Sequence, residues 1–317
     1  MIKIIIFSLI SNLLFYSYGH LIKFEKFSNK IDSINNRSII GCILVSFIAL
    51  VANFFVPLDK TFNTLLLILG FLILFILKKK ELKKKELYYI LTSSIITSSL
   101  LIYSNVNRPD AGLYHLPYIN FINENKIIFG LSNIHFRFGH VSIMQYLSAI
   151  NNNLLFKEIG IVIPLASIVS FFVIHFFNNT IQIFKNIKLT TLSNIFALFI
   201  IIFISYKINR YSSFGNDAVA HLSFFYLISI LLNKEKNNLN FITLISVFIF
   251  LNKTTMLIIF LIPILIFIKN YHYKNFRLIY SLSGLFLIAW ILKNIIVSGC
   301  MIYPLKQTCF KSLNWTD

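Results

Sequence analysis

The sequence lacks the short motifs that mark the common soluble enzymes. Its 317 residues contain no Gly-x-Ser-x-Gly, no glycine-rich phosphate-binding loop and no His-Glu-x-x-His. These absences argue against serine hydrolases, soluble nucleotide enzymes and zinc peptidases of the usual kinds. No internal repeat and no Gly/Ser linker divides the chain. We therefore treat residues 1–317 as a single domain.

Acidic residues are scarce, with 11 Asp and Glu against 29 Lys and Arg and a formal net charge of +18. A nucleic-acid-binding protein would gather such a surplus on a soluble domain, and no soluble domain is evident in the sequence. The lysines instead fall in short stretches between apolar runs, where they orient membrane spans. We therefore expect no nucleic acid partner.

Apolar residues are abundant. They make up 57% of the chain, and the mean hydropathy is +0.78, whereas soluble domains are roughly 45–50% apolar. Several runs approach the roughly 20 residues needed to cross a bilayer. The sequence predicts an all-α fold, a polytopic transmembrane helical bundle. An enzyme of this kind would take a lipid-linked substrate.

The apolar runs predict about ten spans. The run Lys78–Lys85 is the strongest orientation signal and assigns its loop to the cytoplasm. Counting spans from there assigns the stretches around Asp110, Asp217 and Lys253 to the opposite face. The expected spans are 1–21, 38–56, 61–77, 87–104, 159–177, 191–206, 218–232, 239–251, 256–268 and 278–297. The sequence leaves open whether the chain is complete or is cut from a longer protein.

Residues 105–158 form the longest stretch between spans, too long for a passive connection. We expect them to be an outer loop with two amphipathic helices lying on the membrane face. The first covers 114–122, with Pro117 in its first turn. The second starts near Ser142 and runs to Ile150.

Asp110 is the principal catalytic candidate. A carboxylate at the mouth of a span can act as a general base or bind a cation. The alternative is a helix N-cap, a common role for aspartate. Asp217, which follows Asn216 at the start of another span, either helps to hold an acceptor or a divalent cation, or is a helix N-cap. Lys253 interrupts an apolar run, and we expect it either to bind a phosphate or to extend its ammonium to the membrane interface.

Other polar residues of the outer loop are candidate substrate-binding residues. Arg137 can hold a phosphate through two hydrogen bonds, or it can pair with lipid phosphates. Tyr114 is either a membrane-interface anchor or a substrate contact. His115 and His135 complete the set. The histidine spacing matches no strong ligand motif, so we predict no metal site formed by histidines. Cys300 and Cys309 are a disulfide candidate if their loop faces an oxidising compartment; otherwise they are free thiols.

The two stretches from Asp110 to Pro117 and from Gly130 to Arg137 resemble the first outer loop of the GT-C class of membrane glycosyltransferases, and most closely a bacterial branch of it. The later polar stretches resemble that branch as well. The resemblance covers roughly residues 105–315. The better-known GT-C enzymes have one span before their acidic residue, whereas four are expected here, and their soluble C-terminal domain has no counterpart. The matching segments are Asp110-Ala-Gly-Leu-Tyr114-His115-Leu-Pro117, Gly130-Leu-Ser-Asn133-Ile-His135-Phe-Arg137, Gly215-Asn216-Asp217 with His221, Asn252-Lys253, and Ser298-Gly299-Cys300 with Tyr303-Pro304.

The resemblance implies a transfer of sugar from a polyprenyl-phosphate donor to a glycan or lipid acceptor of the cell envelope. It implies that Asp110 is the base or an acceptor-binding group. The expected location is a bacterial inner membrane with the active face toward the periplasm, in contact with membrane lipid. Mg²⁺ or Mn²⁺ stays open as a cofactor. A transporter or flippase for a lipid-linked or small anionic substrate, and a non-catalytic assembly protein, remain the alternatives.

Overall fold

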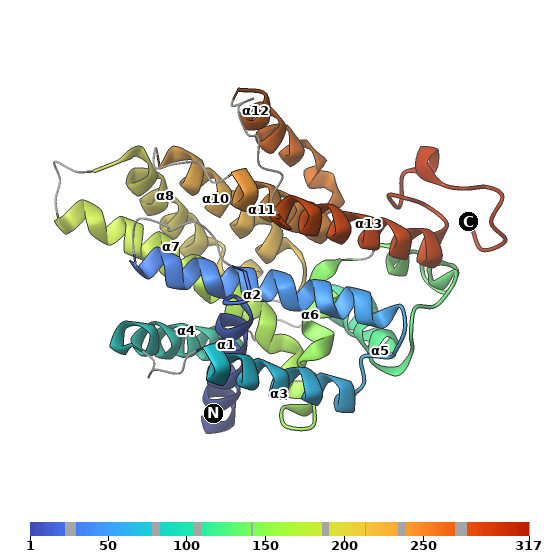
Figure 1. The fold of residues 1–317 in the computed structure, drawn as a ribbon, viewed down its shortest axis with the longest axis horizontal. Coiled ribbons are helices and arrows are strands. Elements are labelled where there is room, and N and C mark those ends of the chain that lie inside the picture. Colours follow the sequence, from blue (N-terminus) through green and yellow to red (C-terminus); the bar gives the residue numbers. More distant parts are fainter. Residues whose placement is uncertain are drawn as a thin grey trace.

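The computed structural model describes residues 1–22, 30–77, 83–103, 109–140, 142–185, 190–212, 214–233, 239–269 and 278–316. Within these ranges all regular structure is helical, and strand-like pairing is limited to an isolated bridge between Cys300 and Cys309. The predicted all-α class is therefore confirmed. Figure 1 shows α2 and α13 running along the long axis of the bundle, with α12 projecting away from the other helices.

Each predicted apolar run contains a helix, because most of its residues are apolar and only isolated Gly or Pro residues interrupt it. The helices within the predicted spans are α1 (Ile2–Tyr18), α2 (Lys30–Asn53), α3 (Lys60–Leu77), α4 (Lys84–Tyr103), α7 (Ile163–Lys185), α8 (Leu192–Tyr206), α10 (Asp217–Leu232), α11 (Leu239–Asn252), α12 (Leu261–Lys269) and α13 (Leu278–Ser298). Shorter elements are η1 (Ala111–His115), α5 (Leu116–Glu124), η2 (Leu131–Asn133), η3 (Phe136–Gly139), α6 (Ile143–Ile150), η4 (Lys157–Val162), α9 (Ile208–Tyr211), η6 (Thr254–Phe260) and η7 (Lys306–Thr308).

Three helical segments of the described chain are long and apolar enough to cross a membrane: Ile34–Asn53, Lys157–Lys185 and Ser281–Ser298. Six more apolar helices are shorter. The predicted count of ten spans therefore stays a prediction. Of the basic run Lys78–Lys85 that gave the predicted orientation, residues 78–82 lie outside the described residues.

The start of α2 differs from the sequence-based prediction. We expected residues 22–37 to form a polar loop, but α2 already begins at Lys30. Near its start, Asn35 and Asn36 are polar yet almost inaccessible to solvent. Tyr89 donates to Asn35 at 2.5 Å, and Tyr226 donates to Asn36. These hydrogen bonds let the helix continue through asparagines that hydropathy alone assigns to a loop.

The outer-loop helices are partly as expected. α5 follows Pro117 in its first turn, and the second helix starts after Ser142, where Ser142 and Gln145 form a capping box. The prediction that α6 lies on the membrane face is wrong, because all eight of its residues are buried. It packs against α2, α5 and α7 in the interior of the bundle. A helix buried on all sides carries no interfacial stripe.

Two glycines allow α1 and α2 to pack backbone against backbone. A Cβ placed on Gly41 of α2 would lie 1.7 Å from the carbonyl oxygen of Phe15, and one on Gly19 would lie 1.8 Å from that of Arg37. No side chain can rotate to relieve these clashes, because the neighbouring atoms are backbone. Small residues at crossings of this kind are typical of helices that pack within membranes. The crossing positions α1 against α2 and thereby the core around them.

We expect Gly41→Ala to reduce the yield and thermal stability of the folded protein strongly, since separating α1 from α2 costs at least about 1–3 kcal/mol. Gly284→Ala is the matched control. Gly284 also lies within a helix, α13, but no atom lies within 4 Å of a Cβ built there. Alanine at that site should be neutral or stabilising by up to about 1 kcal/mol. Thermal unfolding in detergent measures both. Equal effects would contradict the close crossing.

Candidate functional site

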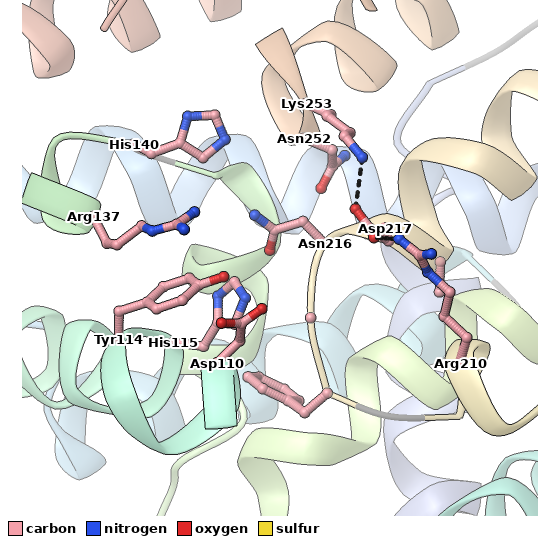
Figure 2. Close-up of a pocket in the computed structure, with 13 residues that line it drawn as sticks. Asp110, Tyr114, His115, Arg137, His140, Arg210, Asn216, Asp217, Asn252 and Lys253 are labelled. Atoms are coloured by element: carbon pink, nitrogen blue, oxygen red, sulfur yellow. Dashed lines mark hydrogen bonds and ion pairs between the residues drawn. The ribbon is translucent and has the colours of Figure 1, made fainter. Parts of the chain in front are cut away.

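Four separate segments of the chain meet at one pocket of about 310 Å³. They are the start of the long outer loop, the segment around η3, the start of α10, and the break after α11. Figure 2 shows their polar side chains pointing toward a common space. The lining residues are Asp110, Tyr114, His115, Arg137, His140, Arg210, Phe214, Gly215, Asn216, Asp217, Ala218, Asn252 and Lys253.

The first segment is a π-helical turn, η1, which leads directly into α5. π turns interrupt regular helices and occur often at functional sites. Asp110 precedes this turn and its side chain makes no capping hydrogen bond, so the N-cap alternative does not describe it. Burial raises the pKa of Tyr114, and the negative charge of Asp110 adds to that shift while Arg137 opposes it.

The second segment supplies Arg137 and His140 from either side of Gly139. The guanidinium carbon of Arg137 lies 5.3 Å from the ring centroid of Tyr114, a cation–π geometry that links this segment to the first. Burial lowers the pKa of His140, and the positive charges of Arg137 and Lys253 lower it further. His140 therefore favours its neutral form at pH 7.

The third and fourth segments are joined by ion pairs. Asp217 lies in the first turn of α10 and accepts hydrogen bonds from Lys253, at 2.7 Å, and from Arg210. Lys253 has an extended backbone between α11 and η6, so the predicted interruption of this apolar run is confirmed. Asp217 is paired with two cations and is not the N-cap of α10, which is Asn216. Figure 2 shows the Asp217–Lys253 pair on the opposite side of the pocket from Arg137.

The charges of the pocket do not balance. Arg137, Arg210 and Lys253 face two carboxylates, Asp110 and Asp217. Because Asp217 is held between two of the cations, Arg137 and Asp110 are the charged groups that remain available to a ligand. Asp110 also has a side-chain hydrogen bond with Tyr114. A site with a surplus cation and a second carboxylate suits a substrate that carries both an anionic group and an exchangeable hydroxyl proton.

The structure brings together most of the residues singled out in the sequence. One pocket is lined by Tyr114, His115, Asn216, Asp110, Arg137, Asp217 and Lys253. This agrees with the expectation that the stretches around Asp110, Asp217 and Lys253 lie on one face. His135 does not line it. Its Nδ1 accepts a hydrogen bond from the backbone N–H of Arg137 at 3.2 Å, and its ring stacks on Phe136. His135 therefore shapes the turn that presents Arg137.

Arg210 and Asn252 line the pocket although the sequence did not single them out as site residues, and His140 lines it although its histidine spacing indicated no specific role. Arg210 is seven residues before Asp217, a spacing that indicates no contact because the chain turns between them. Asn252 is fully buried, and its Nδ2 donates to the carbonyl of Phe248 while its Oδ1 has no partner in the described part of the chain. The signal available in the sequence was an asparagine at the end of an apolar run, next to Lys253.

The described residues hold no cluster of three or more His, Cys, Asp or Glu side chains that could hold a metal ion. Asp217 is already paired with the side chains of Arg210 and Lys253. Asp110 is therefore the carboxylate of this pocket that could still bind a metal ion. The pocket therefore offers a divalent cation few ligands of its own, and Mg²⁺ or Mn²⁺ stays an open prediction.

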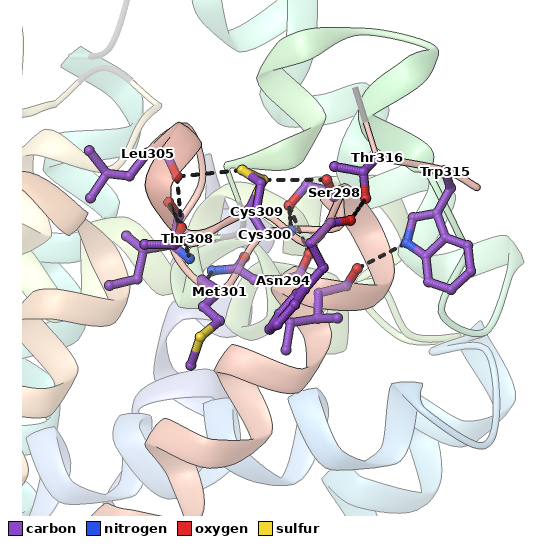
Figure 3. The surroundings of a disulfide bond; sticks show 12 residues. Asn294, Ser298, Cys300, Met301, Leu305, Thr308, Cys309, Trp315 and Thr316 are labelled. Carbon is purple, nitrogen blue, oxygen red and sulfur yellow. Dashed lines mark hydrogen bonds between the residues drawn. A yellow bond between two sulfur atoms is a disulfide. The ribbon is translucent and has the colours of Figure 1, made fainter. Parts of the chain in front are cut away.

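The predicted disulfide between Cys300 and Cys309 is present. Figure 3 shows it closing the loop that follows α13. This loop supports the second segment of the pocket: a Cβ on Gly139 would lie 2.8 Å from the Tyr303 ring, and Asn133 donates to the Trp315 carbonyl at 3.3 Å. Trp315 in turn donates from its ring nitrogen to Ile295 of α13 at 3.0 Å.

The fold and the pocket define a helical protein with apolar helices of membrane-spanning length and one charged pocket built by four distant segments. The chain belongs to the family described as a domain of unknown function, DUF8201, whose model matches residues 1–316. No curated protein and no solved structure matches the chain.

We expect the stability of the protein to fall between pH 6.5 and pH 4 because of His115. Burial lowers the pKa of His115 from 6.5 to about 4. The unfolded chain therefore binds a proton in this interval that the folded protein does not, so acid favours unfolding. At about 1.4 kcal/mol for each tenfold change, the contribution is roughly 3 kcal/mol.

Thermal unfolding in detergent across this pH range measures the effect. His115→Gln should flatten the pH dependence, whereas His135→Gln, which changes a histidine outside the pocket, should leave the slope as it is. An unchanged slope in His115→Gln would show that the ring is already protonated in the folded protein.

Proposed function

We propose that this protein is a membrane glycosyltransferase that moves a sugar from a polyprenyl phosphate to a cell-envelope acceptor. The observation that carries the proposal is the composition of the pocket. Asp110, whose carboxylate does not cap a helix, lies there beside more cations than carboxylates. A glycosyl transfer from a lipid phosphate needs both parts. The acceptor must lose a proton, and the phosphate must be held as it leaves.

The proposed step is an inverting displacement. The acceptor oxygen attacks the anomeric carbon, its proton passes to Asp110, and the bond from that carbon to the phosphate oxygen breaks with its electron pair remaining on the phosphate. Arg137 and Lys253 stabilise the negative charge that grows on the leaving group. Lys253 can serve in this way while held by Asp217, because one ammonium has three N–H donors. Asn216 and His115 orient the substrate.

The location of the pocket is proposed to be the outer face of a bacterial inner membrane. The disulfide loop supports this assignment, because disulfides persist in oxidising compartments. That loop packs against the segment that carries Arg137, through Tyr303 on Gly139. The disulfide and the pocket therefore belong to the same side of the membrane. The apolar helices are proposed to form the path for the polyprenyl tail.

Asp110→Asn should lower the rate of sugar transfer by a factor on the order of 10²–10⁴, the usual contribution of a general base. The assay follows label from polyprenyl-phosphate sugars into cell-envelope glycans, with protein in proteoliposomes. Asp59→Asn is the matched control, since Asp59 accepts a hydrogen bond from the Phe62 backbone at 2.7 Å and lies outside the pocket.

Full transfer by a stably folded Asp110→Asn protein would remove the base assignment. Label that crosses the vesicle membrane without any transfer would instead favour a transporter or flippase, which could use the same charged pocket to hold an anionic substrate.

Thiol labelling tests the proposed side of the membrane. After mild reduction of intact spheroplasts, a membrane-impermeant maleimide should modify Cys309, which is partly exposed, in preference to Cys300, which is buried. Cys42, the free cysteine of the described chain, is buried and should stay unmodified. A Cys300→Ser/Cys309→Ser protein is the negative control. Labelling that requires the membrane to be permeabilised would assign the pocket to the cytoplasm.

A further inference from the structure

His115 and Gln145 form a buried side-chain pair in the wall of the pocket. Gln145 Nε2 lies 3.3 Å from His115 Nδ1, and the two residues are 3% and 4% exposed, respectively. A neutral histidine carries its proton on one of two nitrogens, and the other nitrogen is an acceptor. Which nitrogen is protonated decides whether the ring donates or accepts a hydrogen bond in the pocket.

The orientation of the Gln145 amide follows from the capping box of α6. The backbone N–H of Ser142 lies 3.2 Å from Gln145 Oε1. A backbone N–H can only donate, so the oxygen of the amide must face Ser142. The amide NH₂ then faces His115, and an NH₂ can only donate as well. His115 Nδ1 is therefore an acceptor that carries no proton.

The other ring nitrogen faces the ligand space. A Cβ built on Gly215 would lie 3.7 Å from His115 Nε2, and both residues line the pocket. The ring is held in place by Tyr114, at 4.2 Å between centroids, and by the edge of Phe214. Within the described residues, Nε2 has no hydrogen-bond partner of its own.

We propose that Gln145 is a positioning residue that fixes His115 as the Nε2–H tautomer, so that the ring donates a hydrogen bond to an oxygen of the substrate. In this state His115 is not a base in the pocket. It also cannot bind a cation through Nε2, because that nitrogen has no free electron pair. The part of this inference that concerns substrate rests on the proposed function, whereas the tautomer itself does not.

The oxygen acceptor belongs either to the phosphate or to the sugar of the donor. Both offer oxygen lone pairs that can accept a hydrogen bond from Nε2–H. A donor aimed at such an oxygen strengthens as negative charge develops there, which is how preorganised donors act in catalysis. The charged and titratable groups around the ring are Asp110, Tyr114, Arg137, His140 and Asp217.

Solid-state NMR of protein with ¹⁵N-labelled histidine, in lipid at neutral pH, tests the tautomer directly. His115→Gln identifies the His115 signals by their loss. We expect a protonated Nε2 and an unprotonated Nδ1. A protonated Nδ1 in the wild-type protein would overturn the inference, whatever the protein catalyses.

Gln145→Glu is the informative variant, because one carboxylate oxygen still accepts from Ser142 while the other now requires a proton on Nδ1. We expect the His115 signals to change to the Nδ1–H form at neutral pH and to the doubly protonated ring in mild acid. Gln145→Met, which has similar length and no polar group, should give a mixture of tautomers. Should either variant fail to fold, the wild-type spectrum still decides.

Binding of a polyprenyl phosphate of defined chain length supplies the functional readout. Gln145→Glu should weaken binding about tenfold or more at neutral pH, since a hydrogen bond to a charged group is lost. Binding should recover in mild acid, where the doubly protonated ring again offers Nε2–H. A merely structural defect would not recover with acid.

Two outcomes separate this inference from the proposed function. Wild-type protein that shows the expected tautomer but binds no polyprenyl phosphate would overturn the donor class and leave the tautomer standing. Unchanged binding in a Gln145→Glu protein whose tautomer has switched would overturn the role of His115 as a donor to this ligand.

Discussion

The need to satisfy backbone hydrogen bonds in apolar surroundings governs where this chain can stop being helical. An N–H or C=O left without a partner in such surroundings costs several kcal/mol, so regular helix is the default and each interruption needs a local replacement. Two interruptions, the π turn after Asp110 and the extended residue Lys253, meet at the same pocket. The pocket is thus where the bundle tolerates irregular backbone and gains polar side chains in return.

Asp217 links several of the segments that form the pocket. It joins the start of α10 to Arg210, before the helix, and to Lys253, at the break after α11. A charge buried or half-buried without a partner is costly, and these pairs hold the break at Lys253 against the start of α10. Because that carboxylate is committed to structure, Asp110 is the acid free for chemistry. The two aspartates look alike in the sequence and differ in the structure through their neighbours alone.

The helices could be predicted from the sequence because hydrophobic runs are local signals. So could the break at Lys253 and the helix start at Ser142, where polar residues interrupt a run or form a capping box. Burial of α6 could not, since it depends on α2, α5 and α7 arriving from distant parts of the chain. The contact of Arg210 with Asp217 could not be predicted for the same reason, because it depends on a turn of the chain between them. His135 was predicted to bind substrate, but its ring accepts a hydrogen bond from the Arg137 backbone instead.

The support that residues 295–316 give to the segment around Arg137 has a consequence for biosynthesis. A chain is made from its N-terminus, so Asp110 and Arg137 leave the ribosome long before Tyr303 and Trp315 do. The early helices can pack while the wall of the pocket that carries Arg137 still lacks Tyr303 against Gly139 and Trp315 beside Asn133. The pocket is therefore completed last, after α13 has been made, and a partly synthesised chain does not yet present the assembled site.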